Sequence, residues 1–263
     1  SATGGTDQLF IDTAADDSVS ITNLSLTNIE EIQVDDTVAV SINASAVSGQ
    51  SIKIIGTAAN DVLGLTGTDN ADTIDLSNLD NKHAGNDANL KITGGKGADT
   101  ITLSEGIDTV VYENAANNGA DVIKSFTGGT DKLDFNTFMD KTIAFIEGLG
   151  AAGSGAIAKT TAGAASGGTD IDGKIILLDK ADFTDVAAIQ TAILGSTTND
   201  KLFIENGDLA VILHGTVADG AQTFDVLFVT GTDTATEHSE TITNVGTIQV
   251  ADGDAITASD MIA

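Results

Sequence analysis

Glycine and aspartate recur in one central segment at a spacing that suits the binding of a metal cation. Residues 94–102 match the nine-residue pattern G-G-x-G-x-D-x-U-x at every defined place, with Asp99 at the sixth. The next nine residues keep this register with Gly106, Asp108 and Val110. A glycine-rich turn exposes backbone carbonyls beside the carboxylate, and Ca²⁺ prefers oxygen ligands of these two kinds. The segment therefore predicts calcium-binding turns.

Two less regular copies precede this segment. Residues 56–63 and 67–74 each carry a first glycine, a sixth aspartate and an eighth apolar residue. Their sixth-place aspartates are 11 residues apart instead of nine, so these copies are degenerate. A single turn of this kind would be read as a solvated hairpin turn, but several copies in one segment favour calcium. The candidate ligand residues are Asp61, Asp69, Asp72, Gly94, Gly95, Gly97, Asp99, Gly106 and Asp108.

These turns need short strands to position them. The repeat predicts a turn of about six residues followed by a strand of about three, with the aspartate facing the next coil. Paired turns would then enclose a calcium ion, and glycine is needed where the backbone takes a positive φ or crowds the ion. The apolar residues at the eighth place should point inward and stack. They are Leu63, Ile74, Ile101 and Val110.

The first half of the chain is strand-like almost throughout. Residues 18–22 and 38–42 alternate apolar with small polar side chains, which is the pattern of a strand with one buried face. Turn signals rich in aspartate and glycine separate these stretches. We therefore predict that residues 1–135 form one β-rich domain, with its clearest repeats at 56–111.

The second half, residues 136–263, has a different pattern and is predicted to be a smaller β-rich domain. Residues 148–170 are rich in glycine, alanine and serine, which is typical of a flexible loop or a domain junction. Residues 175–178 predict a buried strand. The spacing of apolar residues predicts one helix near 182–194, with Asp182 as its N-cap. Three hairpin-like strands follow, the first two joined through Asn206-Gly207.

Composition narrows the possible partners. The chain has 39 acidic residues, 31 of them aspartate, against 11 lysines and no arginine, and its net charge is −28. It is therefore a poor candidate for binding nucleic acid, which is recognised through cationic side chains. So much negative charge repels itself unless a salty medium screens it or bound divalent cations neutralise it. Cysteine is absent, no signal peptide opens the sequence, and no apolar run approaches the roughly 20 residues of a membrane helix.

Several segments resemble RTX proteins, and in particular RTX-type bacterial surface-layer proteins. Residues 94–111 resemble RTX calcium repeats, and 118–135 resemble the segment "D-x-I-x-x-F-x-x-G-x-D-x-L-D" that closes their β-rolls. Residues 26–34 with 41–45, and residues 245–261, are similar to coils and to the C-terminal end of surface-layer members. The resemblance implies a parallel β-roll or β-solenoid and calcium as the cofactor. It also adds Asp121 and Asp131 to the calcium ligands.

The same resemblance implies a route and a place. Surface-layer RTX proteins carry a C-terminal signal for type I secretion, which fits the lack of an N-terminal one. The implied location is the extracellular cell surface, where the chain would assemble with copies of itself and could be anchored by lipopolysaccharide.

Catalytic patterns are absent from the sequence. Its three histidines, His83, His214 and His238, form no H-E-x-x-H helix motif, and no G-x-S-x-G elbow is present. Paired aspartates could serve a glycosidase, but one tyrosine and no tryptophan leave few aromatic platforms for a sugar. We therefore expect a protein that is not an enzyme.

The leading hypothesis is a calcium-dependent structural protein of an extracellular surface layer. The alternative is a calcium-binding module of a large RTX adhesin or biofilm-matrix fibre, which would stay monomeric without a ligand. An accessory β-roll of a secreted hydrolase would need a catalytic domain before Ser1. An ice-binding solenoid would need ranks of threonine at a fixed period.

Overall fold

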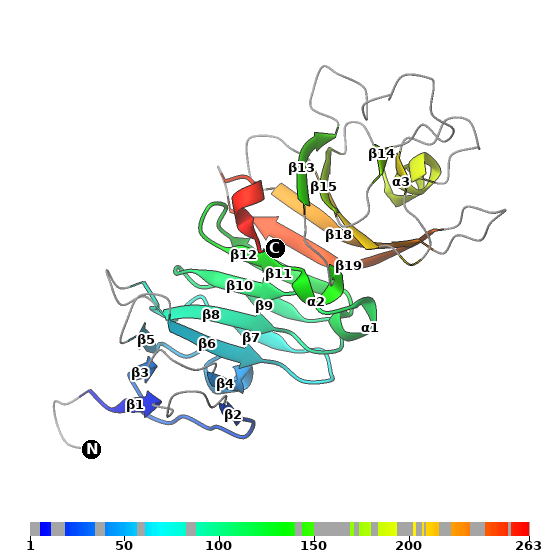
Figure 1. The fold of residues 1–263 in the computed structure, drawn as a ribbon. Coiled ribbons are helices and arrows are strands. Elements are labelled where there is room, and N and C mark those ends of the chain that lie inside the picture. Colours follow the sequence, from blue (N-terminus) through cyan, green and yellow to red (C-terminus); the bar gives the residue numbers. More distant parts are fainter. Residues whose placement is uncertain are drawn as a thin grey trace.

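The chain is built almost entirely of β-strands, with a few short helices (Figure 1). This confirms the prediction of an all-β protein. The helical elements are η1 (Ala44–Ala46), α1 (Ala115–Asn118), α2 (Asn136–Met139), α3 (Val186–Ile193) and η2 (Ala258–Asp260). The computed structural model describes residues 6–11, 19–34, 40–56, 61–82, 88–139, 144–149, 169–170, 174–179, 184–193, 202–203, 207, 209–215, 222–231, 240–251 and 254–262.

Successive strands of the first half alternate between sheets, and every pairing among them is parallel. The even-numbered strands belong to a seven-stranded sheet in the order β2 (Val19–Ile21), β4 (Val40–Asn43), β6 (Asp61–Thr66), β8 (Ala88–Thr93), β10 (Asp108–Val111), β12 (Lys132–Asp134) and β20 (Met261–Ile262). The odd-numbered strands begin with a three-stranded sheet of β1 (Gln8–Ile11), β3 (Glu31–Val34) and β5 (Lys53–Gly56).

The remaining odd-numbered strands lie in an eight-stranded sheet. An isolated parallel bridge joins Lys53 of β5 to Asp80. Asp80 follows β7, which comes first in the sequence among the strands of that sheet. The order of the sheet is β13 (Ala144–Leu149), β15 (Lys174–Asp179), β17 (Leu209–Gly215), β18 (Gln222–Gly231), β19 (Glu240–Val250), β11 (Asp121–Phe126), β9 (Thr100–Thr102) and β7 (Thr73–Asp75). Figure 1 shows the first-half strands stacked one above the next from the N-terminal end.

The core between these sheets is a set of apolar rows that run across the strands. The four residues predicted to point inward, Leu63, Ile74, Ile101 and Val110, are all buried, with at most 3% of their surface exposed. Parallel pairing places equivalent residues of successive coils side by side, so each row is continuous. One row in the eight-stranded sheet contains Ile74, Ile101, Ile123 and Ile248.

The second half is joined to the first within both large sheets. After β12 the chain forms β13, β15 and α3, and then β17, β18 and β19, which pair antiparallel. Strand β19 then returns to pair in parallel with β11, and β20 pairs in parallel with β12. A two-stranded sheet of β14 (Thr169–Asp170) and β16 (Leu202–Phe203) completes the fold. Strands from both sides of residue 135 therefore share two sheets.

An aromatic cluster also spans residue 135. Phe228 of β18 stacks on Phe138 of α2, with ring centroids 3.7 Å apart. It also packs edge-on against Tyr112 and Phe135 at 6.1 and 6.3 Å. A second apolar cluster lies under α3, where Ile189 is buried against residues of β15, β17 and β18. The predicted buried strand at 175–178 lies within β15.

Of the elements predicted in the second half, the helix is confirmed and the Asn206-Gly207 hairpin is wrong. Helix α3 lies inside the predicted range and begins after Asp185, whose carboxylate accepts the Ala188 N–H at 2.8 Å; Asp182 lies outside the described residues. The prediction of a hairpin through Asn206-Gly207 is wrong, because β17 pairs with β15 in parallel and β16 pairs with β14. Most of the predicted loop at 148–170 also lies outside the described residues.

Candidate metal centre

Two stacks of turns, one at each edge of the paired sheets, hold most of the predicted ligands. The first turn stack contains the turns 67–72, 94–99 and 112–120, which lead from the seven-stranded to the eight-stranded sheet. The second turn stack contains the turns 103–107, 127–131 and 254–260, which lead back. Each turn ends on or next to an aspartate. One turn with the strand after it takes about nine residues and carries the chain from one sheet to the other, so consecutive aspartates lie at opposite edges of the sheets. Two such steps return the chain to the same sheet and make one coil.

In the first turn stack Asp99 and Asp121 each accept a hydrogen bond from the aspartate one coil earlier. Oδ1 of Asp99 accepts the backbone N–H of Asp72 at 2.8 Å, and Oδ1 of Asp121 accepts that of Asp99 at 3.0 Å. These partners are 27 and 22 residues apart in the sequence. These aspartates therefore reach the preceding coil and not, as the repeat predicted, the next one, and their contact there is a backbone N–H.

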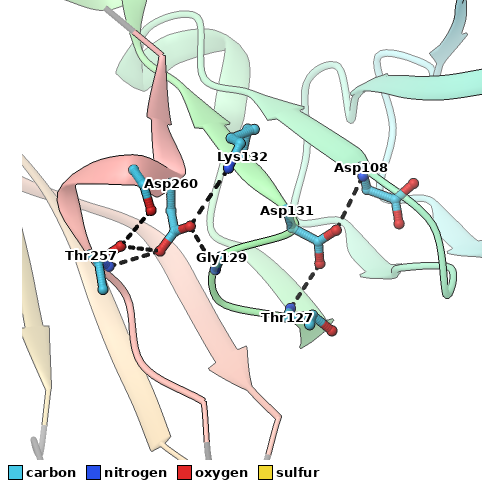
Figure 2. Close-up of polar contacts among 8 residues, drawn as sticks. Asp108, Thr127, Gly129, Asp131, Lys132, Thr257 and Asp260 are labelled. Carbon is cyan, nitrogen blue, oxygen red and sulfur yellow. Dashed lines mark hydrogen bonds and ion pairs between the residues drawn. The ribbon is translucent and has the colours of Figure 1, made fainter. Parts of the chain in front are cut away.

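The second turn stack repeats this arrangement (Figure 2). Oδ1 of Asp131 accepts the backbone N–H of Asp108 at 3.1 Å. One coil further, Oδ1 of Asp260 accepts the N–H of Gly129 at 2.8 Å, and Lys132 lies 3.7 Å from the same oxygen. Asp260 was not among the predicted ligands, yet it is fully buried in the next turn of the stack, where the pairing of Leu133 with Met261 places it opposite Lys132.

In four of the six turns, the second oxygen of the aspartate carboxylate is held by its own turn. Four residues before the aspartate, a serine or threonine donates its backbone N–H, as Thr127 does to Asp131 at 2.8 Å. Ser104 donates both its N–H and its hydroxyl to Asp108, at 2.7 and 2.8 Å. Thr68 does the same for Asp72, and Thr257 for Asp260 with a spacing of three. Sequence reasoning missed these partners, although the serine or threonine that lies three or four residues before each of these four aspartates is a visible signal.

The glycines of the turns allow neighbouring coils to approach closely. Gly95 and Gly97 have φ of +94° and +107°, which confirms that the turn at 94–99 needs residues that tolerate a positive φ. A side chain at Gly94 would overlap the carboxylate of Asp99, and one at Gly106 would overlap the amide of Asn81. Glycine therefore leaves room for a carboxylate of the same turn at Gly94 and for an amide of the neighbouring coil at Gly106.

The aspartates of the two stacks are buried, and burial changes their protonation. Asp99 is 1% exposed, Asp121 5%, and Asp108 and Asp131 are fully buried. Burial raises the pKa of Asp121 and that of Asp131 to about 7, and that of Asp108 to about 6. The neighbouring carboxylate adds to the rise for Asp121 and Asp131. Near neutral pH Asp121 and Asp131 are therefore partly protonated, and a bound cation would displace those protons.

The donor set fits a hard cation. Oδ2 of Asp99 and Oδ1 of Asp108 are buried and have no hydrogen-bond partner. A buried carboxylate oxygen without a partner is costly, and a cation would satisfy it. Among the described residues no three Asp, Glu or His side chains converge on one point. A calcium ion there would therefore need backbone carbonyls of the turns to complete its shell, which Ca²⁺ accepts as ligands.

The other predicted ligands lie apart from these pairs. The side chain of Asp69 is 76% exposed and pairs with Lys96 at 2.8 Å. Asp61 is buried at the start of β6, but its partner in the next coil is Ala88, so no carboxylate follows it. In the second turn stack, the coil before Asp108 contributes Asn81 instead of an aspartate. The amide oxygen of Asn81 accepts the Ser104 hydroxyl at 3.0 Å.

Of the three histidines, the described part of the chain contains His214. It is buried in β17, with Nδ1 3.5 Å from Oδ2 of Asp225 on the adjacent strand β18. His83 and His238 lie outside the described residues. None of the helices described is long and apolar enough to cross a membrane.

The sequence was also compared with known proteins. It matches no protein-family model, and the search of curated proteins found no related chain. The case for a function therefore depends on the residues and their arrangement.

Proposed function

We propose that this chain is a calcium-stabilised, non-catalytic structural protein that folds and assembles outside the cell. One observation carries the proposal: both turn stacks bury aspartates one coil apart, and each stack contains a carboxylate oxygen without a partner. Such a repeated arrangement of oxygen donors favours a hard divalent cation over a catalytic site.

The electrostatics support a cation. Asp99 and Asp121 lie together in the first turn stack, and Asp108 and Asp131 in the second. Ionising two buried neighbours without a counter-charge is unfavourable, and lysines are few in this chain. Asp99 with Asp121 would hold one calcium ion, and Asp108 with Asp131 another, together with turn carbonyls. When bound, calcium supplies the positive charge that lets these aspartates stay ionised.

Calcium would then drive folding by mass action. It binds the folded turns and has no comparable site in the unfolded chain, so each occupied site stabilises the fold. At a hundredfold excess over Kd, one site contributes about 2.7 kcal/mol. In this proposal the parallel, alternating sheets are a β-roll of the RTX type. A chain of this kind would stay unfolded in a calcium-poor cytosol, be exported by a type I system, and fold at the cell surface.

The proposed end state is a self-assembled surface layer of an RTX-type surface-layer protein. Calcium between copies would allow acidic surfaces to approach, and lipopolysaccharide would be the cell anchor. The second candidate is a module of an RTX adhesin or matrix fibre, which the same turn stacks would support. The two differ in assembly: a layer protein forms ordered particles alone with calcium, whereas an adhesin module stays monomeric.

The experiment is a calcium titration of chelator-stripped protein, read by circular dichroism for strand content and by light scattering for assembly. The double variant Asp99→Ala with Asp108→Ala removes one carboxylate from each stack and should shift the folding midpoint to higher calcium. Asp69→Ala is the matched control, because its carboxylate is exposed and paired with Lys96. It should leave the midpoint unchanged.

Each outcome has a separate meaning. Strand signal and large ordered particles appearing together would support the surface layer. Folding without assembly would move the adhesin module ahead. If calcium changes neither signal, the turns hold no calcium and the proposal fails.

A further inference from the structure

The last coil of the second turn stack has a different register from the coil before it. The pairing of β10 with β12 places Asp108 opposite Asp131, so one carboxylate meets another. The pairing of β12 with β20 is shifted by one residue and places Asp260 opposite Lys132. The spacing from Thr257 to Asp260 is likewise three residues, against four in the equivalent turns. The last coil therefore sets a carboxylate against an ammonium group.

Lys132 gives the Asp260 carboxylate a counter-charge from the protein itself. The ammonium lies 3.7 Å from Oδ1 of Asp260, and the carboxylate is fully buried whereas the lysine side chain is 26% exposed. The same oxygen accepts the Gly129 N–H, and Oδ2 accepts the N–H and the hydroxyl of Thr257 (Figure 2). A buried carboxylate that is both ion-paired and hydrogen-bonded has the compensation that its burial requires. This site therefore needs no further cation.

The aspartates assigned to calcium differ in this respect. Oδ2 of Asp99 and Oδ1 of Asp108 are buried without a hydrogen-bond partner. Within the described part of the chain, the lysines that form ion pairs with an aspartate reach Asp69, Asp134 and Asp260, and none of these belongs to the two calcium pairs. Lysine pairing and the open carboxylate oxygens therefore occur at different coils.

We infer that Lys132 is the resident cation of the last coil: its ammonium takes the place that calcium takes between the aspartates of the preceding coils, so that this coil closes without metal. The inference rests on the proposed function, since it takes the two aspartate pairs named there as the calcium sites. It makes Lys132 the residue that decides where calcium dependence ends. Burial and the Asp108 carboxylate raise the pKa of Asp131, and the Lys132 ammonium opposes that rise, so its charge also acts on the neighbouring calcium pair.

Closure without metal protects an edge of the seven-stranded sheet. Strand β20 pairs with β12 at the end of the strand order, so β12 would be an edge strand if the last coil came away. An exposed edge strand is a template for pairing with another chain. With Lys132 in place, this edge should stay covered at calcium concentrations too low to fill the sites of the preceding coils.

Amide hydrogen exchange at two N–H groups tests the inference, because each group donates to a different contact between coils. The Gly129 N–H donates to Asp260 in the last coil, and the Asp108 N–H donates to Asp131 in a proposed calcium pair. The measurement covers calcium concentrations at which circular dichroism shows a folded protein. Exchange at Asp108 should slow as calcium rises, whereas exchange at Gly129 should stay constant.

Three variants isolate the lysine. At a calcium concentration where every variant is folded, Lys132→Gln removes the charge and should speed exchange at Gly129 by about tenfold or more. Lys132→Arg keeps the charge and should restore slow exchange. Lys96→Gln is the matched control, because Lys96 pairs with Asp69, whose side chain is 76% exposed. It should exchange at Gly129 like the unchanged protein.

Two results would overturn the inference and leave the proposed function standing. In the first, exchange at Gly129 in the unchanged protein slows with calcium as strongly as exchange at Asp108, so the last coil also takes metal. In the second, Lys132→Gln exchanges at Gly129 no faster than Lys96→Gln, so the ammonium does not hold the coil. If calcium alters exchange at neither N–H while Lys132→Gln still speeds it at Gly129, the calcium function fails but the lysine remains the counter-ion of the last coil.

Discussion

The backbone N–H of Asp108 donates a 3.1 Å hydrogen bond to Oδ1 of Asp131, the residue that occupies the same place one coil later. Oδ2 of Asp131 accepts the Thr127 N–H at 2.8 Å, so one buried carboxylate connects two coils. Asp131 therefore has a structural role that does not depend on calcium, and the two roles can be separated by experiment.

Replacing Asp131 with alanine should destabilise the calcium-free protein. The change leaves the backbone N–H groups of Asp108 and Thr127 without their acceptor. Each loss costs up to about 3 kcal/mol. Denaturant unfolding in the presence of a chelator measures the loss. Asp69→Ala should change the free energy of unfolding by less than about 0.5 kcal/mol, as expected of an exposed site. Equal effects of the two substitutions would show that the contacts between coils add no stability.

The stability of the calcium-free protein should fall as the pH rises from about 4 to about 7. The pKa values of Asp121 and Asp131 are raised to about 7 in the folded state, against about 3.9 in an unfolded chain. Between these values the folded state binds more protons than the unfolded state, so raising the pH removes stability. Thermal unfolding across this range, with a chelator present, measures the slope.

With calcium present, the stability of the protein should instead rise as the pH increases, because protons and calcium compete for these carboxylates. Acidification also lowers the general repulsion of a chain with net charge −28. Asp121→Asn separates the two effects, since it removes one titrating buried group and should flatten the slope of the calcium-free protein. An unchanged slope would assign the pH dependence to the general repulsion.

Gly119→Ala should be far more harmful than Gly129→Ala. Both glycines have a positive φ, +58° and +77°, a backbone conformation in which alanine is strained. A side chain at Gly119 would also overlap the carbonyl oxygen of Gly97 in the preceding coil, whereas nothing lies within 4 Å at Gly129. Denaturation midpoints of the two variants measure the difference. Equal midpoints would mean that the coils can separate at Gly119 without cost.

Phe228→Ala should destabilise both halves of the chain together, by about 3–5 kcal/mol. Phe228 belongs to β18 in the second half but packs on Tyr112 and Phe135 of the first half and on Phe138 just after it. Calorimetry of the unchanged protein and the variant provides the measurement, and each should unfold in a single transition. Two transitions, with the one from residues 1–135 unaffected, would instead support the predicted division into separate domains.

Local patterns were enough to predict much of the first half. The alternation of apolar and polar residues identified the strands, and the eighth-place residues such as Ile74 and Ile101 are buried as expected. The sixth-place aspartates Asp99 and Asp108 lie in stacked turns because the repeat fixes both the turn and the strand.

Features that depend on distant parts of the chain could not be predicted in this way. Asp260 lies in the second turn stack although its turn lacks the glycine repeat, and only the pairing of β20 with β12 brings it there. The hairpin expected at Asn206-Gly207 failed because β17 is buried along nearly its whole length and gains more by pairing with β15 and β18. A turn signal describes neighbouring residues and contains nothing about such competition.

The return of β19 and β20 to the first-half sheets has a kinetic consequence. The hydrogen bond from Gly129 to Asp260 joins residues 131 positions apart, and it completes the second turn stack. Contacts of such long range are slow to form, because bringing two distant segments together costs chain entropy before the contact adds any stability. A nascent chain cannot make this contact until Asp260 has been synthesised. Completion of the second turn stack therefore waits for the synthesis of β20 and of the turn before it, however early the preceding coils have folded.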